Sequence, residues 1–195
     1  MTMTTVLPDN LKIALKEWAT VCAALEFGRQ IILLRKGGIY EAAGEFELEN
    51  REFLLFPTYV HQNAAMVKPA FREGLSQVSA EPAEVRLSSI GVVSDVIQLS
   101  SRQQVDAIDA EHVWAPPLID MRFNYKPQNP LYLIIVRAFR LASAVTVPNT
   151  PAYAGCKSWV PLEEPIAAAG AVAALDDAAF ETRRRTILQR LSTGA

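Results

Sequence analysis

The segment LYLIIVRAFRL, residues 131–141, is the feature that most limits how this chain can fold. Its side chains are largely apolar on both alternating faces, which is typical of a strand that is buried on both sides. Such a strand lies inside a sheet and not at its edge. The segment therefore predicts a central strand.

The rest of the chain alternates between short strands and helices. We expect further strands at 18–27, 30–36, 53–56, 85–99 and 156–162, and helices at 9–17, 61–79 (in two pieces), 101–104, directly after Pro117 and at 176–191. Some strands follow one another through short turns and others are separated by helices. This pattern favours an α+β fold with a mixed, mainly antiparallel sheet flanked by helices.

Local turn and break signals set several of these boundaries. Gly28-Arg29 is expected to form a type II′ turn that joins the first two strands into a hairpin. Pro57 is expected to end the strand at 53–56, and Lys68-Pro69 to interrupt the helical segment. The length of 195 residues fits one domain, which we place at 8–192, with flexible termini at 1–7 and 193–195.

Composition excludes several classes of protein. The formal net charge of −2 provides no global attraction for nucleic acid, so any such binding requires a local basic patch. No secretory signal opens the chain, and its apolar runs are too short to span a bilayer. Cys22 and Cys156 lie far apart and the chain has two histidines, which argues against a disulfide framework or a metal site. We expect reduced thiols and a cytoplasmic protein.

Two arginines occupy positions where the pattern predicts core. Arg137 shares a face of its strand with Leu133, Ile135 and Phe139, and Arg184 lies in the apolar stripe of the last helix. A guanidinium keeps its charge, so each needs a carboxylate, carbonyl groups or an anionic ligand. An internal ion pair and an anion site both remain open. Internal partners could be Glu17, Glu41, Glu52, Asp95 or Asp120.

A basic group also ends the strand at 30–36. Arg35 and Lys36 precede Gly37-Gly38, whose backbone N–H groups could face a phosphate. The segment lacks the spacing of a Walker loop or a dinucleotide fingerprint, so a simple turn with solvated charges is the alternative.

The stretch after Pro57 collects hydrogen-bonding groups of different kinds. Thr58, Tyr59, His61 and Gln62 would gather where a strand ends and a helix begins, a place where sheets present groups to ligands. His61 could act as an acid, a base or a phosphate donor, or could be a capping histidine. His112, before Val113-Trp114 and two prolines, is interpreted as part of a packed corner.

The function that these residues favour is binding of a phosphate-bearing ligand, with nucleic acid among the candidates, through a basic pocket. Tyr59 or Trp114 would supply a stacking surface. One alternative is a metal-dependent, nuclease-like phosphodiesterase, although the strand at 53–56 carries no carboxylate. Others are thiol chemistry by Cys156 with His61, and a protein-interaction scaffold without catalysis. Whether the protein is an enzyme, its cofactors and its oligomeric state stay open.

Several motifs together resemble a known family. ALKEWATVCAALEFGRQIILLRKGGI, FLLFPTYVHQ followed by KP, the HVW corner, NPLYLIIVRAFRL and GCKSW are similar to the bacterial domain of unknown function 1802, from about Leu11 to Leu191. The resemblance implies a compact, soluble, single-domain prokaryotic protein and transfers no catalytic residue. The motif positions to test first are Arg35, Lys36, Gly37, Gly38, Pro57, Thr58, His61, Gln62, Arg137, Cys156 and Trp159.

Overall fold

Strand β7 (Leu131–Pro148) lies inside the main sheet, as its sequence predicts. It pairs along one edge with β6 (Glu84–Leu99) and along the other with β2 (Ile32–Arg35) and β9 (Val172–Ala173). The computed structural model describes residues 6–36, 41–42, 45–46, 50–73, 75, 78–155 and 157–193. Residues 131–136 are all buried, which confirms the prediction of a central strand.

Seven strands form this sheet in the described part of the chain. Six of them follow the order β2-β7-β6-β5-β1-β8, and β9 joins β7. All neighbours are antiparallel except β1 (Asn10–Trp18) and β5 (Glu52–Thr58), which run parallel. The other strands are β8 (Trp159–Ala167) and a separate pair, β3 (Glu41–Ala42) with β4 (Glu45–Phe46).

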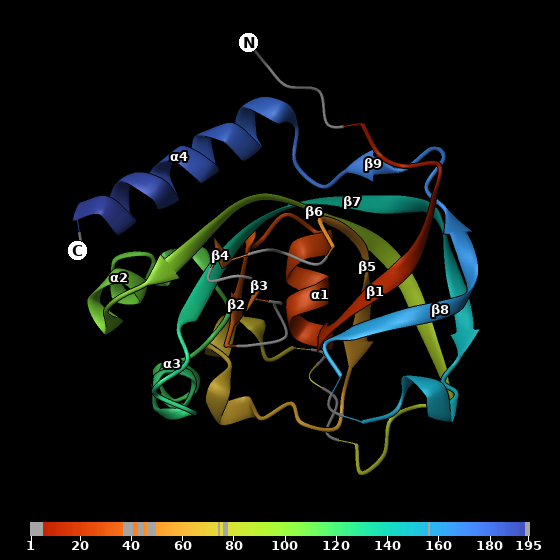
Figure 1. The fold of residues 1–195 in the computed structure, drawn as a ribbon, viewed down its shortest axis with the longest axis horizontal. Helices are drawn as coiled ribbons and strands as arrows, with labels where there is room; N and C mark the ends of the chain where they lie inside the picture. The colour runs from red at the N-terminus through yellow and green to blue at the C-terminus, as the bar shows by residue number, and fades with distance from the viewer. Residues whose placement is uncertain are drawn as a thin grey trace.

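Helices pack around the strongly curved sheet (Figure 1). The described α-helices are α1 (Ala19–Glu26), α2 (Arg102–Ala107), α3 (Pro116–Asn124) and α4 (Asp177–Thr193). Short 3-10 turns lie at Ala64–Met66, Pro69–Phe71, Asp109–Glu111 and Pro151–Tyr153. The expected α+β fold with a mixed, mainly antiparallel sheet is confirmed.

The first two predicted elements were wrong, because strand β1 occupies the expected helix. Leu11 and Ala14 belong to the same core cluster although they are three positions apart, a spacing typical of a helix. A shift of register between Leu11 and Ile13, in the pairing with β8, explains how both reach one side of the strand. A bulge of this kind breaks the alternation by two on which a strand prediction depends.

Helix α1 occupies most of the segment predicted as a strand. Its buried residues Val21, Cys22, Ala24 and Leu25 follow helical spacing, and it is rich in alanine. Gly28 has φ +64 and its N–H donates to Leu25 O, so it ends the helix instead of turning a hairpin. Strand β2 consequently pairs with β7 and not with the residues just before it.

Three other boundaries also differ from expectation. Pro57 lies inside β5, opposite Glu17 of β1, because β6 pairs β5 only up to Leu54 and leaves that edge free of ladder bonds. The helical segment expected at 61–79 contains two 3-10 turns that end at Met66 and Phe71. Strand β8 begins at Trp159, three residues later than predicted.

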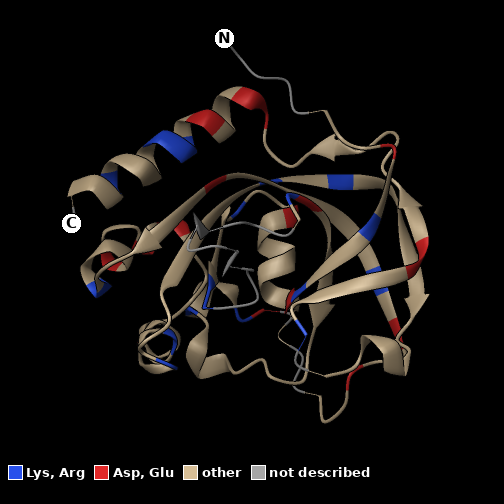
Figure 2. Cartoon of the chain, in the orientation of Figure 1, with Lys and Arg blue, Asp and Glu red and all other residues tan. Residues whose placement is uncertain are grey.

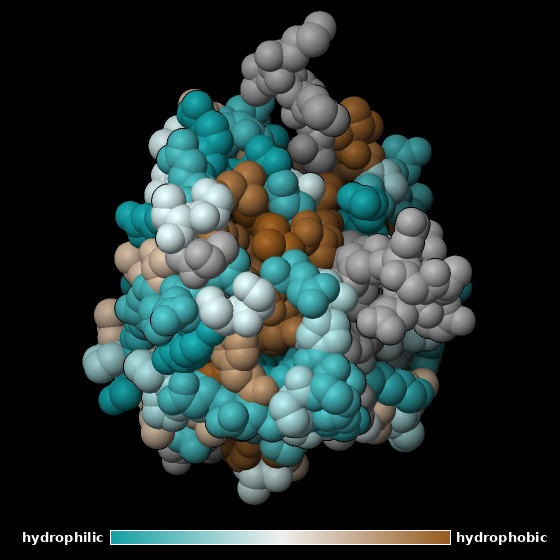
Figure 3. Space-filling model, turned by 60° about the vertical axis from the view of Figure 1, so that its left-hand side comes forward, coloured by the Kyte–Doolittle hydropathy of each residue, from teal (hydrophilic) through white to brown (hydrophobic). Residues whose placement is uncertain are grey.

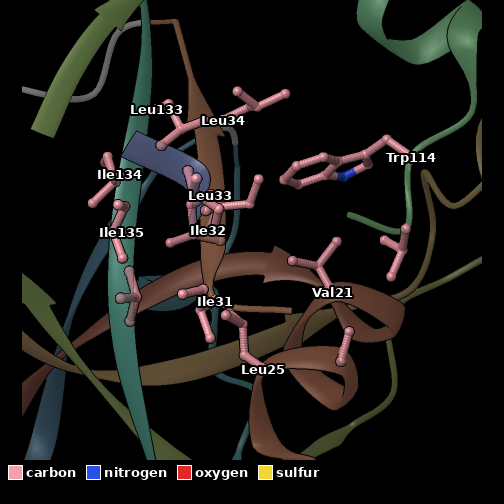
Figure 4. Packing of buried hydrophobic residues seen from close by; sticks show 14 of the residues in the cluster. Val21, Leu25, Ile31, Ile32, Leu33, Leu34, Trp114, Leu133, Ile134 and Ile135 are labelled. Atoms are coloured by element: carbon pink, nitrogen blue, oxygen red, sulfur yellow. The ribbon is translucent and has the colours of Figure 1, made fainter. Parts of the chain in front are cut away.

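The buried hydrophobic residues form two clusters. The first cluster includes α1, β2, β7 and Trp114, whose indole ring lies among aliphatic side chains (Figure 4). The second cluster lies on the other face of the sheet and includes Leu54, Phe56, Leu87 and Ile166. Strands β6 and β7 contribute residues to both clusters, so the two clusters are connected through these strands.

The surface carries few large apolar side chains. Figure 3 shows one face with hydrophobic atoms in its middle and hydrophilic atoms around them. Phe27 and Val172, which are about 60% exposed, belong to separate segments. Scattered exposed residues of this kind are normal in monomeric proteins. A recess lined by polar groups is therefore a better place for a ligand than an apolar patch.

Candidate functional site

A pocket of about 790 Å³ lies beyond the carboxyl ends of β1 and β5. Because these two strands are parallel, both end at the same edge of the sheet, where α/β proteins commonly bind ligands. Loop residues 81–83 and 149–158 form further walls, and β2 and α3 contribute one arginine each. Four Lys or Arg and two Glu line the pocket, which gives a surplus of two positive charges.

Glu17 and Arg35 form the best-ordered polar contact of the pocket. Glu17 Oε2 lies 3.0 Å from a terminal nitrogen of Arg35, and Oε1 accepts a hydrogen bond from the Trp18 N–H at 2.9 Å. The side chains are 5% and 11% exposed. One carboxylate therefore neutralises Arg35 while holding the backbone where β1 passes into α1.

Arg122, from α3, brings a second guanidinium to the lining of the same pocket. Burial lowers its pKa, the Glu17 carboxylate raises it and the Arg35 charge lowers it further. Its Nε atom is buried and has no hydrogen-bond partner among the described residues. The Glu17 carboxylate thus pairs with Arg35 and acts on Arg122 only through its charge, and the half-buried Arg122 keeps a buried Nε donor without a partner among the described residues.

Lys16 lies on the opposite face of β1 from Glu17. Its ammonium group donates to the carbonyl oxygens of Tyr153 and of Gly155, the latter at 3.2 Å, and lies 5.8 Å from the Phe56 ring centre. These contacts tie the 149–158 wall to the sheet. In Figure 2 positive and negative segments meet here, at the carboxyl end of β1.

A short turn after β5 forms the rim. Thr58 donates to the carbonyl oxygen of Glu17 at 3.1 Å. The backbone N–H groups of Tyr59 and Val60 donate to the Glu81 carboxylate at 2.9–3.0 Å, which fixes the turn. His61 follows, exposed to solvent and facing the pocket.

The structure brings some of the predicted site residues together and separates others. Arg35, Thr58 and His61 line the pocket, whereas Tyr59 and Gln62 lie behind the rim. Gln62 is buried, and its Oε1 accepts hydrogen bonds from the N–H and hydroxyl groups of Thr20, in the first turn of α1.

The remaining residues of the basic loop and of the core lie elsewhere. Lys36 donates to Phe123 O at 2.7 Å, and Gly37 and Gly38 lie outside the described residues. Arg137 forms an ion pair with Asp177 and lies above the rings of Phe139 and Phe180.

Arg184 is also tied to an acid of its own. Its Nε donates to Asp95 at 2.6 Å, and these contacts raise the pKa of Arg184 and lower that of Asp95. For Asp95, burial opposes this lowering. Arg137 and Arg184 therefore attach α4 to the sheet, outside the pocket.

Among the described residues, the groups that the alternative functions require do not meet. Trp114 is 2% exposed and belongs to the core, so it offers no stacking surface. Cys156 lies outside the described residues. Glu52 precedes Pro57 by five positions in β5, and thus lies about 15 Å along the strand from the level of Glu17. The described His, Cys, Asp and Glu side chains form no group of three or more suited to a metal ion.

Comparison with known proteins identifies the family. The model of the domain of unknown function DUF1802 matches residues 14–186, and the chain belongs to this family. A crystal structure of a serine-to-alanine mutant of ZmASCH from Zymomonas mobilis is similar, with 8% identity and a TM-score of 0.45, covering 93% of this chain and 99% of that chain. No curated protein matches the chain. None of the described helices is long and apolar enough to cross a membrane.

Sequence reasoning missed two cationic residues of the pocket. Lys16 lies in a segment that was expected to be helical, and Arg122 lies in a short helix far away in the chain. Lys157, in the loop before β8, also lines the pocket. The adjacent, oppositely charged residues Lys16 and Glu17 stand at the end of an apolar segment, and this pattern is a signal that could have identified Lys16.

Proposed function

We propose that this pocket binds a phosphate-bearing ligand, and that Arg35 and Arg122 hold the phosphate. The observation that supports the proposal is that two guanidinium groups line one pocket, of which Arg35 forms an ion pair with Glu17 while Arg122 keeps a buried Nε donor without a partner among the described residues. A buried charge without a full partner is unfavourable in the empty protein. An incoming anion would supply the missing partner. Because binding would relieve the unfavourable burial of the Arg122 charge, this relief would add to the binding free energy.

The chemistry of the lining agrees with this role. Arginine presents a planar fork of donors that matches phosphate oxygens, and Lys16 and Lys157 add positive charge at the sides. The volume of about 790 Å³ lies in the range of small-molecule sites. Nucleic acid is the second source of phosphate. With a net charge of −2, the protein would hold it through this local patch alone.

Replacement of Arg122 by methionine tests the proposal. We expect binding of pyrophosphate, measured by isothermal titration calorimetry at low salt, to weaken at least about tenfold, since a hydrogen bond to a charged group is worth roughly 1.5–3 kcal/mol. Stability of the empty variant should be unchanged or slightly higher, because an underpaired buried charge is removed.

Arg140, an exposed arginine on β7 that does not line the pocket, is the matched control. Arg140→Met should leave pyrophosphate binding unchanged. Equal weakening by the two substitutions would indicate diffuse attraction to the surface and would contradict the proposal, as would the absence of any binding by the unmodified protein.

A further inference from the structure

The pocket has a nearly closed end and an open end. At the closed end the side chains of Glu17 and Arg35 are 5% and 11% exposed, and Arg122 is half-buried. At the open end His61, Pro151 and Lys157 are exposed. A ligand therefore enters past the rim and meets the paired guanidinium groups at the far end.

A closed cationic end suits a terminal phosphate. The phosphorus of a phosphodiester carries two substituents, and both need a way out of the site. A phosphomonoester carries one, so its three free oxygens can face the protein while its single substituent points to the open end. Its charge of about −1.5 to −2 at neutral pH also exceeds that of a diester and matches two guanidinium groups better.

The rest of the pocket is much larger than a phosphate and has a different character. Trp18 directly follows Glu17, and its half-buried indole lines the pocket beside Val60 and Pro82. An aromatic surface next to a cationic end is the combination that stacks a nucleobase near its phosphate.

Hydrogen-bonding side chains also line the pocket. Asn149 donates through Nδ2 to Pro82 O at 2.9 Å, and its N–H donates to Ala83 O, so the 81–83 and 149–158 walls are fastened to each other. This leaves its Oδ1, together with Ser158, to meet a polar edge of the ligand. The walls are fixed in place independently of the ligand.

We infer that the ligand carries a nucleoside monophosphate group, free or at the end of a strand, with its terminal phosphate at Arg35 and Arg122 and its base against Trp18. This inference rests on the proposed phosphate site and specifies its ligand class. Calorimetric titration of the full chain with each common nucleoside monophosphate tests it. The comparison ligands are the methyl diester of each nucleotide, ribose phosphate, inorganic phosphate and the uncharged nucleoside.

We expect at least one nucleoside monophosphate to bind about tenfold or more tightly than its methyl diester and than ribose phosphate. Trp18→Leu should remove the advantage over ribose phosphate and leave the affinity for inorganic phosphate unchanged. A short oligonucleotide with a terminal phosphate, compared with the same strand lacking it, distinguishes a strand end from a free nucleotide. Tighter binding of the phosphorylated strand than of the free nucleotide assigns the site to strand ends, and the reverse order to free nucleotides.

Three results would overturn the inference. Equal affinity for monoester and diester would show that the bound phosphate is not terminal. Equal affinity for the nucleotide and ribose phosphate would show that the base does not contribute to binding. In both cases the phosphate site itself would stand. Failure of every anion to bind would remove the phosphate site as well.

Discussion

At the scale of single residues, Glu17 does more for the pocket than any group that the sequence singles out. Its carboxylate pairs with Arg35 and accepts from the Trp18 N–H, while its carbonyl oxygen accepts from Thr58. These partners come from two other strands and from its own chain neighbour. From the sequence, Glu17 was only one of five acids that could pair with a buried arginine. Which acid pairs with which arginine depends on the strands that become neighbours in the fold.

His112 makes stability depend on pH. Burial, with the Lys68 charge adding to it, lowers the pKa of this histidine to about 4 from 6.5, and the side chain is 1% exposed. Between these pH values the unfolded chain binds the proton and the folded chain does not, so stability falls as pH falls from 6.5 to 4. We expect a loss of about 3 kcal/mol across this range in urea denaturation.

The second histidine of the chain is the matched control. His112→Gln should flatten the pH dependence between 6.5 and 4, whereas His61→Asn, at an exposed position, should preserve it. Asp95, whose pKa is lowered from 3.8, affects stability only below this range. The prediction fails if the slope survives in the His112 variant.

Gln62 tests the difference between a ligand contact and a structural contact. Since its Oε1 accepts two hydrogen bonds from Thr20, we expect Gln62→Ala to lower the free energy of unfolding by about 1–2 kcal/mol. Pyrophosphate affinity should change less than twofold. Gln98→Ala, at an exposed position on β6, should affect neither quantity, and a large loss of affinity in the Gln62 variant would return this residue to the binding site.

At the scale of elements, regular patterns were predicted well and irregular ones were not. The long strands β6 and β7, the helix α2 and the amphipathic helix α4 follow their sequence signals, and Ser101 caps α2. β1 and α1 were exchanged because the bulge in β1 imitates helical spacing. A bulge is decided by the partner strand, which a local pattern does not contain.

The same reason explains how much of the site could be predicted. Arg35, Thr58 and His61 reach the pocket because each ends or follows a recognisable strand. Lys16 was missed through the error in β1, and Arg122 because α3 approaches the sheet edge only in the folded chain. For Arg137 the sequence left an internal ion pair and an anion site open, and its partner Asp177 of α4 was not among the acids considered.

The ion pair between Arg184 and Asp95 connects α4 to β6, and a double-mutant cycle measures its strength. With side chains 28% and 17% exposed, we expect a coupling free energy of about 1 kcal/mol from Asp95→Asn and Arg184→Gln, reduced at high salt. The more exposed pair Arg102–Asp106 within α2 should couple by about 0.3–0.5 kcal/mol. Equal coupling in the two pairs would contradict a special role in anchoring α4.

At the scale of the whole molecule, β6 and β7 run through both core clusters, so neither cluster can unfold alone. All three tryptophans belong to or pack against the first cluster, whereas Leu87 is fully buried in the second. We expect Leu87→Ala to lower stability by about 2–5 kcal/mol. Tryptophan fluorescence and far-UV circular dichroism should then shift to the same lower urea midpoint. An unchanged fluorescence midpoint would show that the clusters unfold separately.

The pairing of β8 with β1 has a consequence for synthesis of the protein. Lys16, near the start of the chain, donates its N–H to Ser158 O, and the same two residues line the pocket. While the ribosome is still translating, the early strands have no wall opposite them. The pocket is therefore completed only after Ser158 has been synthesised, and a shorter nascent chain lacks this wall.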